Sequence, residues 1–303
     1  MYRKILVPLD GSKTAEKVLP YARYLAGKFN IPVELLAAVD IAEMATHMSA
    51  EKLRHIDTMI EDGVRASTMY LRGVATTFPS GNVTCMVEKG SAEETIIGKA
   101  EADDGTLIAM ATHGRSGLNR FLLGSVAEKV LRGGVNPLLL VRATETAPTT
   151  GETAFKSVVV PLDGSELAES ILPVIAELVK KLGVEVQLFR AYQIPYNVYA
   201  GDEGFYAGNY DALLTSVRDE AAEYLEKKAA DLKRLGVSKV TCVAKEGFAA
   251  DKIIELGRKT SHNLIAMSSH GRSGVRRWVL GSVAEAVVRH SGDPVLITRS
   301  LDR

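Results

Sequence analysis

Short, unbroken apolar runs alternate along this chain with longer segments in which apolar residues recur every three or four positions. In the first half, such runs predict buried parallel strands at 4–9, 33–39, 83–88, 106–111 and 138–142. The helical period occupies residues 15–29, 50–76, 93–102 and 122–132. Because parallel strands require crossover connections, the alternation predicts an α/β fold with a doubly wound sheet of five strands.

A proline lies inside the first helical segment of each half of the chain. Pro20 falls within 15–29, and Pro173 stands at the same place in the second half. Proline removes a backbone donor and clashes with the preceding helical turn. The pattern therefore predicts a kinked helix in both halves.

The chain is a duplication of one domain. Residues 7–12 recur letter for letter as 160–165, and two further blocks recur 157 residues later: 113–117 as 270–274, and 124–128 as 281–285. Between the copies, residues 143–154 are rich in Thr, Pro, Gly and Glu and have no apolar period, which is typical of a linker. We predict two tandem domains, 1–142 and 155–303, joined by a linker at 143–154.

Charge excludes one large class of partner. The chain has 37 basic and 37 acidic side chains, with 17 of each up to residue 150 and 20 of each after it. Proteins that bind nucleic acid normally carry a basic excess, since phosphate neutralisation supplies most of their affinity. Nucleic acid is therefore not an expected partner of either domain.

Membrane and redox roles are also not expected. The longest apolar runs fall far short of the roughly 18 residues that a spanning helix needs, and the first residues lack the pattern of a signal peptide. The two cysteines, Cys85 and Cys242, lie in strand patterns, so they are expected to pack as small hydrophobic side chains. We expect a cytoplasmic protein without a membrane partner.

The first segment with candidate chemistry follows the first strand. Pro8, Leu9, Asp10, Gly11 and Ser12 end that strand, and ligands of open α/β sheets bind beyond the carboxyl ends of strands. A structural interpretation is equally simple: Asp10 and Gly11 form a turn, and Ser12 caps the next helix. The segment alone leaves both interpretations open.

The second segment leaves the fourth strand and leads into a helix. Residues 111–117 contain His113, Gly114 and Arg115, and Gly124 and Ser125 follow. Glycines let backbone N–H groups approach an anion, a helix start favours negative charge, and an arginine adds a cationic fork. The alternative is a glycine-rich connector in which Ser125 only caps the helix. Repetition of the whole pattern in the second copy favours a phosphate cradle.

These residues resemble the universal stress protein family. The resemblance rests on Gly114, nine residues, then Gly124-Ser125-Val126-Ala127-Glu128, with the apolar strand 138–141 later and Asp10 after the first strand. It covers both copies, so the chain looks like a tandem member, and it implies the strand order 3-2-1-4-5 in each domain. The family's nucleotide-binding motif begins with a glycine that is Ala111 in the first copy and Ser268 in the second.

The resemblance also implies two sites for an adenine nucleotide, ATP or AMP, with Mg²⁺ held through Asp10 and Asp163. In the first domain the implied residues are Pro8, Leu9, Asp10, Val39, Met110, Ala111, His113, Gly114, Arg115, Gly124, Ser125 and Val126. In the second they are Pro161, Leu162, Asp163, Tyr192, Met267, Ser268, His270, Gly271, Arg272, Gly281, Ser282 and Val283.

Three functions compete at this point. A binding and regulatory module of the stress response needs only the nucleotide sites. An ATPase or nucleotidyl-transferring enzyme needs a positioned base, and neither His113 nor His270 has a carboxylate in its loop to hold it, so at most slow hydrolysis is expected. An interaction protein that binds no nucleotide would fit the substitutions at Ala111 and Ser268.

Two expectations concern association. By resemblance, the fifth strands (138–141 and 295–298) are expected to pair within one chain, which makes the two halves an intramolecular pseudo-dimer. The Tyr- and Gly-rich segment 192–210 has no counterpart in the first copy, and it is a candidate surface for a further homodimer or a lid. A loop that packs its rings on its own domain fits the sequence equally well.

Overall fold

The computed structural model describes residues 1–41, 55–79, 82–112, 123–142, 150–151, 153–194, 207–259, 262–269 and 280–299, with the backbone alone for 207–210. The chain divides into two compact units, one built on Met1–Ala154 and one on the residues from Phe155 onward. Each unit is described by itself below.

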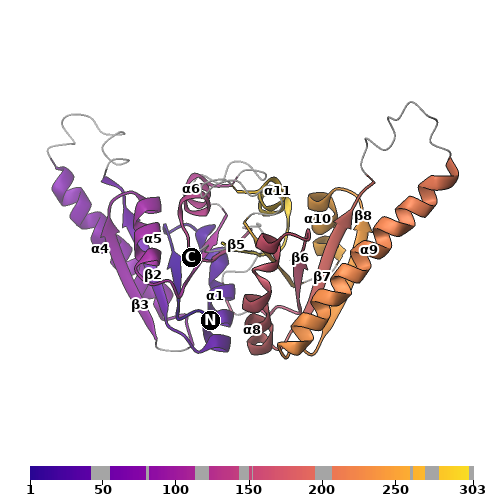
Figure 1. The fold of residues 1–303 in the computed structure, drawn as a ribbon. Coiled ribbons are helices and arrows are strands. Elements are labelled where there is room, and N and C mark those ends of the chain that lie inside the picture. Colours follow the sequence, from indigo (N-terminus) through magenta and orange to yellow (C-terminus); the bar gives the residue numbers. More distant parts are fainter. Residues whose placement is uncertain are drawn as a thin grey trace. The chain divides into compact units, whose positions relative to one another are not determined.

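The first domain alternates strands and helices in the predicted order (Figure 1). Its elements are β1 (Lys4–Pro8), a 3₁₀ turn η1 (Ala15–Val18), α1 (Leu19–Phe29), β2 (Val33–Val39), α4 (Ile56–Ala75), β3 (Val83–Lys89), α5 (Ala92–Glu101), β4 (Thr106–Ala111), α6 (Ser125–Gly133) and β5 (Leu138–Val141).

The second domain repeats this series. Its elements are β6 (Ser157–Pro161), α7 (Glu166–Glu169), α8 (Leu172–Leu182), β7 (Glu185–Tyr192), α9 (Ala207–Arg234), β8 (Val240–Glu246), α10 (Ala249–Lys259), β9 (Asn263–Ser268), α11 (Ser282–His290) and β10 (Val295–Thr298).

Both domains have the expected strand order. The first runs β3-β2-β1-β4-β5 and the second β8-β7-β6-β9-β10. Neighbouring strands within each domain are parallel, with registers such as Ile5 opposite Val33 and Val158 opposite Val186. The predicted fold class, two doubly wound α/β domains with five parallel strands each, is confirmed.

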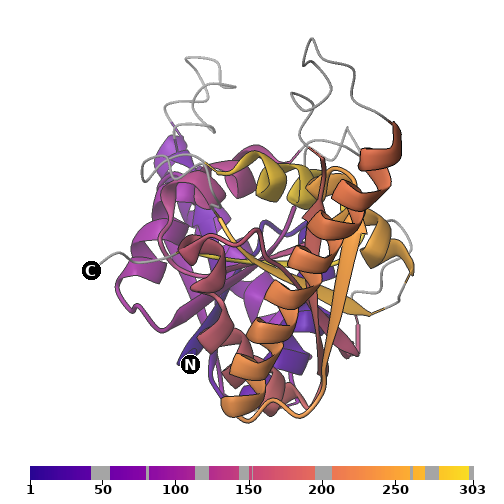
Figure 2. The same ribbon diagram turned by 45° about the vertical axis from the view of Figure 1, so that its right-hand side comes forward.

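Helices cover both faces of each sheet, as right-handed crossovers require. In the second domain α8 and α9 contact each other on one face, while α10 and α11 contact each other on the other. Figure 2 shows the long helix α9 lying along β7 and β8, which it contacts directly. The central strands are consequently buried throughout: every residue of β4 and of β9 is buried. This explains why they read as continuous apolar runs.

The prediction of one kinked helix at Pro20 and Pro173 is wrong. The segment is two elements in each domain: η1 and then α1, and α7 and then α8. Pro20 and Pro173 each lie in the first turn of the second element, α1 or α8. A proline there costs little, because the first N–H groups of a helix have no partner within the helix anyway.

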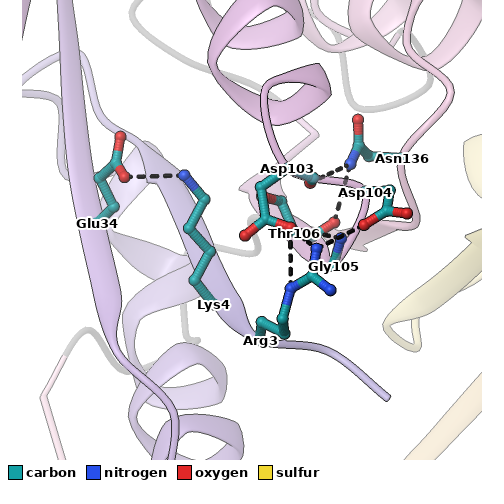
Figure 3. Close-up of polar contacts among 8 residues, drawn as sticks. All are labelled: Arg3, Lys4, Glu34, Asp103, Asp104, Gly105, Thr106 and Asn136. Carbon is teal, nitrogen blue, oxygen red and sulfur yellow. Dashed lines mark hydrogen bonds and ion pairs between the residues drawn. The ribbon is translucent and has the colours of Figure 1, made fainter.

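At the amino edge of the first sheet, polar side chains fix the chain where β1 and β4 begin (Figure 3). The Arg3 guanidinium bonds the carboxylates of Asp103 and Asp104, and Lys4 Nζ lies 3.1 Å from Glu34 Oε2. The Asn136 amide donates to the carbonyl oxygens of Asp103, at 3.2 Å, and of Thr106, at 3.3 Å. These contacts hold the edge of the sheet opposite to the candidate site.

The second domain replaces this asparagine by an acid. Asp293 stands 157 residues after Asn136. Its carboxylate lies against the backbone of Gly257, where a Cβ would come within 2.2 Å of Asp293 Oδ2. Burial raises the pKa of Asp293 to about 6. The ionised form is therefore disfavoured in the fold.

Asp293→Asn is expected to stabilise the second domain above pH 6. Folding raises the pKa of Asp293 from near 4 to about 6. The contribution of its protonated form to the free energy of unfolding is therefore full below pH 4, and it is lost as the pH rises through about 6. The gain near neutral pH is about 1 kcal/mol, since partial exposure screens the charge. Urea denaturation at several pH values measures it. A wild-type stability that stays flat between pH 4 and 7 would contradict the prediction.

Within the part of the chain that the structure describes, helices long and apolar enough to cross a membrane are absent.

Candidate functional site

The candidate site of each domain lies where the strand order reverses. In the first domain β1 pairs with both β2 and β4, so the chain leaves β1 toward one side of the sheet and leaves β4 toward the other. A crevice for ligands opens at such a switch point, beyond the carboxyl ends of the strands. We call the predicted residues around β1 and β4 the first site, and their counterparts around β6 and β9 the second site.

A tight turn follows β1 in the first site. Ser12 donates its backbone N–H to Asp10 Oδ1 at 2.9 Å, and Ser12 Oγ accepts from the Ala15 N–H at 3.0 Å. Between them, Gly11 has a φ of +83°, which favours glycine. The predicted turn is present, and Ser12 bonds the first N–H of η1, although the N-cap residue of η1 is Thr14. The turn leaves Asp10 half-buried at the carboxyl edge.

The second site repeats the turn with the same partners. Ser165 donates both its N–H, at 2.9 Å, and its hydroxyl, at 2.6 Å, to Asp163 Oδ1. Ser165 also caps α7 by accepting from the Ala168 N–H. Each carboxylate is thus held in one orientation, and a carboxylate with these bonds retains acceptor capacity.

The start of α6 is drawn back to the end of β4. Gly124 donates its N–H to the Thr112 carbonyl at 2.7 Å, and Thr112 donates to Val141 at 2.9 Å. In the second domain Gly281 donates to Ser269 at 2.8 Å, and Ser269 to Thr298 at 2.9 Å. The first turn of α6, like that of α11, therefore lies beside the end of a central strand.

Ser125 does not cap the helix, contrary to the connector interpretation. The N-cap residue is Gly124, and Ser125 is the first helical residue, with an exposed side chain. Gly281 and Ser282 occupy the same positions at α11. Since a glycine cap has no side-chain acceptor, the N–H groups of the first turn are left for water or for a ligand.

Conformation does not demand glycine at these caps. Gly124 has φ −61° and ψ 148°, and Gly281 has φ −61° and ψ 144°, values that any residue adopts. A glycine at this position simply has no side chain that could fill the space in front of the helix start. Ala111 and Ser268 end β4 and β9 in extended conformation, so a residue other than glycine causes no backbone strain there.

The residues proposed to flank the base end the second strand of each sheet. Val39 is buried, and its carbonyl accepts from Gly90 at 3.0 Å; Tyr192 is half-buried, and its carbonyl accepts from Gly247 at 3.0 Å. The backbone is the same in both domains, and the side chain differs. The remaining described residues of the two predicted sets lie at the same edge: Pro8, Leu9, Met110, Val126, Pro161, Leu162, Met267 and Val283.

Six predicted residues fall outside the described residues: His113, Gly114, Arg115, His270, Gly271 and Arg272. The same holds for most of the segment 192–210. Their roles stay predictions.

Sequence reasoning missed a tyrosine–carboxylate pair next to each site. Tyr70 on α4 donates its hydroxyl to Glu16 Oε1 at 3.2 Å, and Tyr224 on α9 donates to Glu169 Oε1 at 2.7 Å. The two glutamates follow the Asp-Gly-Ser turns, so each pair ties a turn to the long helix. The repeat marks the two acids, because Glu16 and Glu169 are 153 residues apart like the turns themselves, but it does not indicate their tyrosine partners.

The cysteines are half-buried and lie on the outer strands of the sheets. Burial raises the pKa of the Cys85 thiol, and burial together with Glu226 raises that of Cys242 to about 11. A thiol with a raised pKa carries little of the reactive thiolate at neutral pH. The cysteines are thus less buried than expected for core side chains, and the raised pKa of each thiol is unfavourable for a nucleophile.

The described residues contain no cluster of three or more His, Cys, Asp or Glu side chains that could hold a metal by itself. Among the residues predicted for each site, one carboxylate, Asp10 or Asp163, lies at a strand end. Mg²⁺ bound with nucleotides commonly uses one or two carboxylates together with phosphate oxygens and water. The described residues therefore fit Mg²⁺ that arrives with a nucleotide.

Fold and site together define a tandem pair of doubly wound domains, each with an acidic turn and an open helix start at its switch point. The model of the universal stress protein family matches residues 1–142 and 154–299. The chain belongs to the universal stress protein family.

Similar proteins agree with this assignment. A universal stress protein of Methanocaldococcus jannaschii is 29% identical over 149 residues, which are 49% of this chain and 85% of that protein. One from Mycobacterium tuberculosis is 26% identical over 198 residues, 65% of this chain and 63% of that protein. The crystal structure of a universal stress protein from Archaeoglobus fulgidus has the same fold, with a TM-score of 0.66, 22% identity, and coverage of 98% of this chain and 96% of that one.

Proposed function

We propose that each domain binds an adenine nucleotide, ATP or AMP, together with Mg²⁺, and that the chain acts as a binding and regulatory module of the stress response in the cytoplasm. The observation that supports this best is the start of α6. Gly124 fixes it against β4 by the 2.7 Å bond to Thr112, and its first turn lacks a side-chain cap. Unpaired N–H groups and the helix dipole favour a phosphate there.

Repetition strengthens the proposal. Gly281 is bonded in the same way at α11, and Asp10 and Asp163 each accept the backbone N–H of the serine two residues later. The acid beside the phosphates would be tolerated because Mg²⁺ neutralises both. Ser125 and Ser282, exposed at the first helical position, can add a hydroxyl donor.

ATP with Mg²⁺ is expected to stabilise the protein against heat. A ligand that binds only the folded state, at a concentration 100 times its dissociation constant, adds about 2.7 kcal/mol to the free energy of unfolding. Differential scanning calorimetry of the full chain with ATP, ADP or AMP, each with and without Mg²⁺, measures the effect. GTP is the matched control for the base. A melting temperature that none of the adenine nucleotides changes at millimolar concentration would contradict the proposal.

The same samples separate the two alternatives. Phosphate release from Mg-ATP near the roughly 10 s⁻¹ of a median enzyme would favour an ATPase or a nucleotidyl transferase. Absence of both binding and turnover would favour an interaction protein of the same fold. The backbone at Ala111 and Ser268 is extended and unstrained, which weakens the support that these two substitutions give to that last alternative.

A further inference from the structure

A buried arginine of the first domain contacts the predicted linker. Arg23 lies on α1 and is only 3% exposed. One of its guanidinium nitrogens donates to the Gly151 carbonyl oxygen at 3.0 Å, and another donates to Thr77 Oγ1 at 2.6 Å. The guanidinium carbon lies 5.2 Å from the centre of the Phe78 ring. The predicted linker is therefore held at Gly151 by a side chain from the interior of the first domain.

The groups around the guanidinium are fixed by the end of α4. Thr77 and Phe78 follow this helix directly, and Phe78 is buried. The Thr77 hydroxyl donates to the Val74 carbonyl at 2.6 Å, which orients its oxygen. An arginine fork placed against an aromatic ring is preorganised, so it loses little conformational freedom when it binds a carbonyl. Gly151 thus meets a preformed donor.

The second domain has an alanine in place of this arginine. The residue 153 positions after Arg23 is Ala176, which is buried in α8. Burial of a guanidinium costs free energy unless its donors are bonded. One acceptor of Arg23 is the carbonyl of Gly151, which lies outside the repeated strands and helices. The difference between the copies is explained if Arg23 serves the linker rather than the fold of a single domain.

The linker is fixed at a second point soon afterwards. Gly151 has a φ of +76°, which favours glycine, and a Cβ there would meet nothing within 4 Å. Four residues later, Phe155 is buried in the second domain, and Lys156 donates its N–H to the His262 carbonyl at 2.9 Å. Only residues 152–154 lie between the two fixed points.

We propose that Arg23 is a clasp that docks the linker on the first domain, so that three residues rather than twelve form the tether between the domains. The step from Gly151 to Phe155 spans at most about 14 Å, whereas the whole of 143–154 could span about 40 Å. Because the effective concentration of linked modules falls as their tether lengthens, the clasp favours contact between the two domains of one chain over contact with another chain. The clasp does not depend on nucleotide binding.

Limited proteolysis of the full chain tests the clasp. The endoprotease Glu-C cuts after glutamate, and Glu152 directly follows Gly151. Cleavage of a folded protein tracks the fraction of molecules in which the cleavage site is released. Arg23→Met removes the donors and keeps an unbranched side chain. It is expected to speed cleavage after Glu152 roughly tenfold or more, as loss of a hydrogen bond from a charged group implies. Mass spectrometry identifies the bond that is cut.

A second variant changes the linker and leaves the interior of the domain intact. The valine of Gly151→Val would meet no neighbour, so its effect comes from the positive φ that valine disfavours, and the same acceleration is expected. Gly151→Asn tolerates a positive φ and keeps the carbonyl, so it should be cut as slowly as the wild type. Arg132→Met removes an arginine that is 41% exposed and paired with Glu128, and it should leave the rate unchanged.

Circular dichroism establishes that each variant is folded before digestion. If Arg23→Met does not fold, Gly151→Val decides alone, because its side chain lies outside the core. The clasp is wrong if a folded Arg23→Met or Gly151→Val protein is cut after Glu152 at the wild-type rate. It is also wrong if the wild type is cut there as fast as a synthetic peptide of residues 143–156.

Discussion

Gly124→Val is expected to abolish nucleotide binding by the first domain while the domain stays folded. The backbone at Gly124, with φ −61° and ψ 148°, accepts valine without strain. Its side chain would instead occupy the space in front of the α6 start, where the phosphates are proposed to lie. The loss of a glycine cap costs the helix about 1 kcal/mol or less. Titration calorimetry with Mg-ATP should therefore show one site instead of two.

The second domain and the far edge of the sheet supply matched controls. Gly281→Val should remove the other site, and the double variant should bind no nucleotide. The control variant is Gly27→Val. Gly27 lies near the end of α1, at the edge of the sheet opposite the first site, and a Cβ there would meet nothing within 4 Å. This variant should bind as the wild type does. A folded Gly124→Val protein with two unchanged sites would show that the phosphate cradle lies elsewhere.

Much of the fold could be predicted from the sequence because its strands are buried on both faces. An apolar run such as Thr106–Ala111 has no polar alternation to obscure it, and its predicted bounds agree with those of β4. Because the domain is duplicated, each strand and each motif could be recognised twice in the sequence. The strand order came from the resemblance rather than from the pattern, since an apolar run does not say which strand is its neighbour.

The prediction of a single helix was wrong where one helical pattern spans two elements. Residues 15–29 keep a helical period across a break, because η1 and α1 present apolar residues to the same sheet. Pro20 marks that break correctly but as the start of a helix rather than a kink. Pro173 does the same for α8.

Side-chain partners distant in the sequence were beyond prediction for a different reason. Tyr224 and Glu169 meet because α9 crosses over the turn that follows β6, and their separation follows no period. Contacts of this kind depend on how a helix packs over a distant turn, and a sequence pattern does not give that packing.

The cluster around Glu169 gives the second large expected effect, which is on stability. Glu169 accepts from the Tyr224 hydroxyl at 2.7 Å and from Lys228 Nζ at 2.6 Å, and its side chain is 24% exposed against 21% for Lys228. Removing one partner of a well-enclosed ion pair leaves a charge without compensation, and this costs more than an exposed pair contributes. Lys228→Leu is therefore expected to lower the free energy of unfolding of the second domain by about 2 kcal/mol.

A double-mutant cycle separates the ion pair from the packing of the lysine stem. Glu169→Gln removes the charge that Lys228 neutralises. In the Glu169→Gln background, Lys228→Leu should therefore lower the free energy of unfolding by at least about 1 kcal/mol less than it does in the wild type. The neighbouring Lys227 is the matched control, because it pairs with Glu223 and both side chains are 69% exposed. Lys227→Leu should change stability by about 0.5 kcal/mol or less. Urea denaturation followed by circular dichroism provides all the values. If Lys228→Leu and Lys227→Leu lower the free energy of unfolding equally, Glu169 needs no cation. The Tyr224 hydroxyl would then hold the turn of Asp163 against α9 by itself.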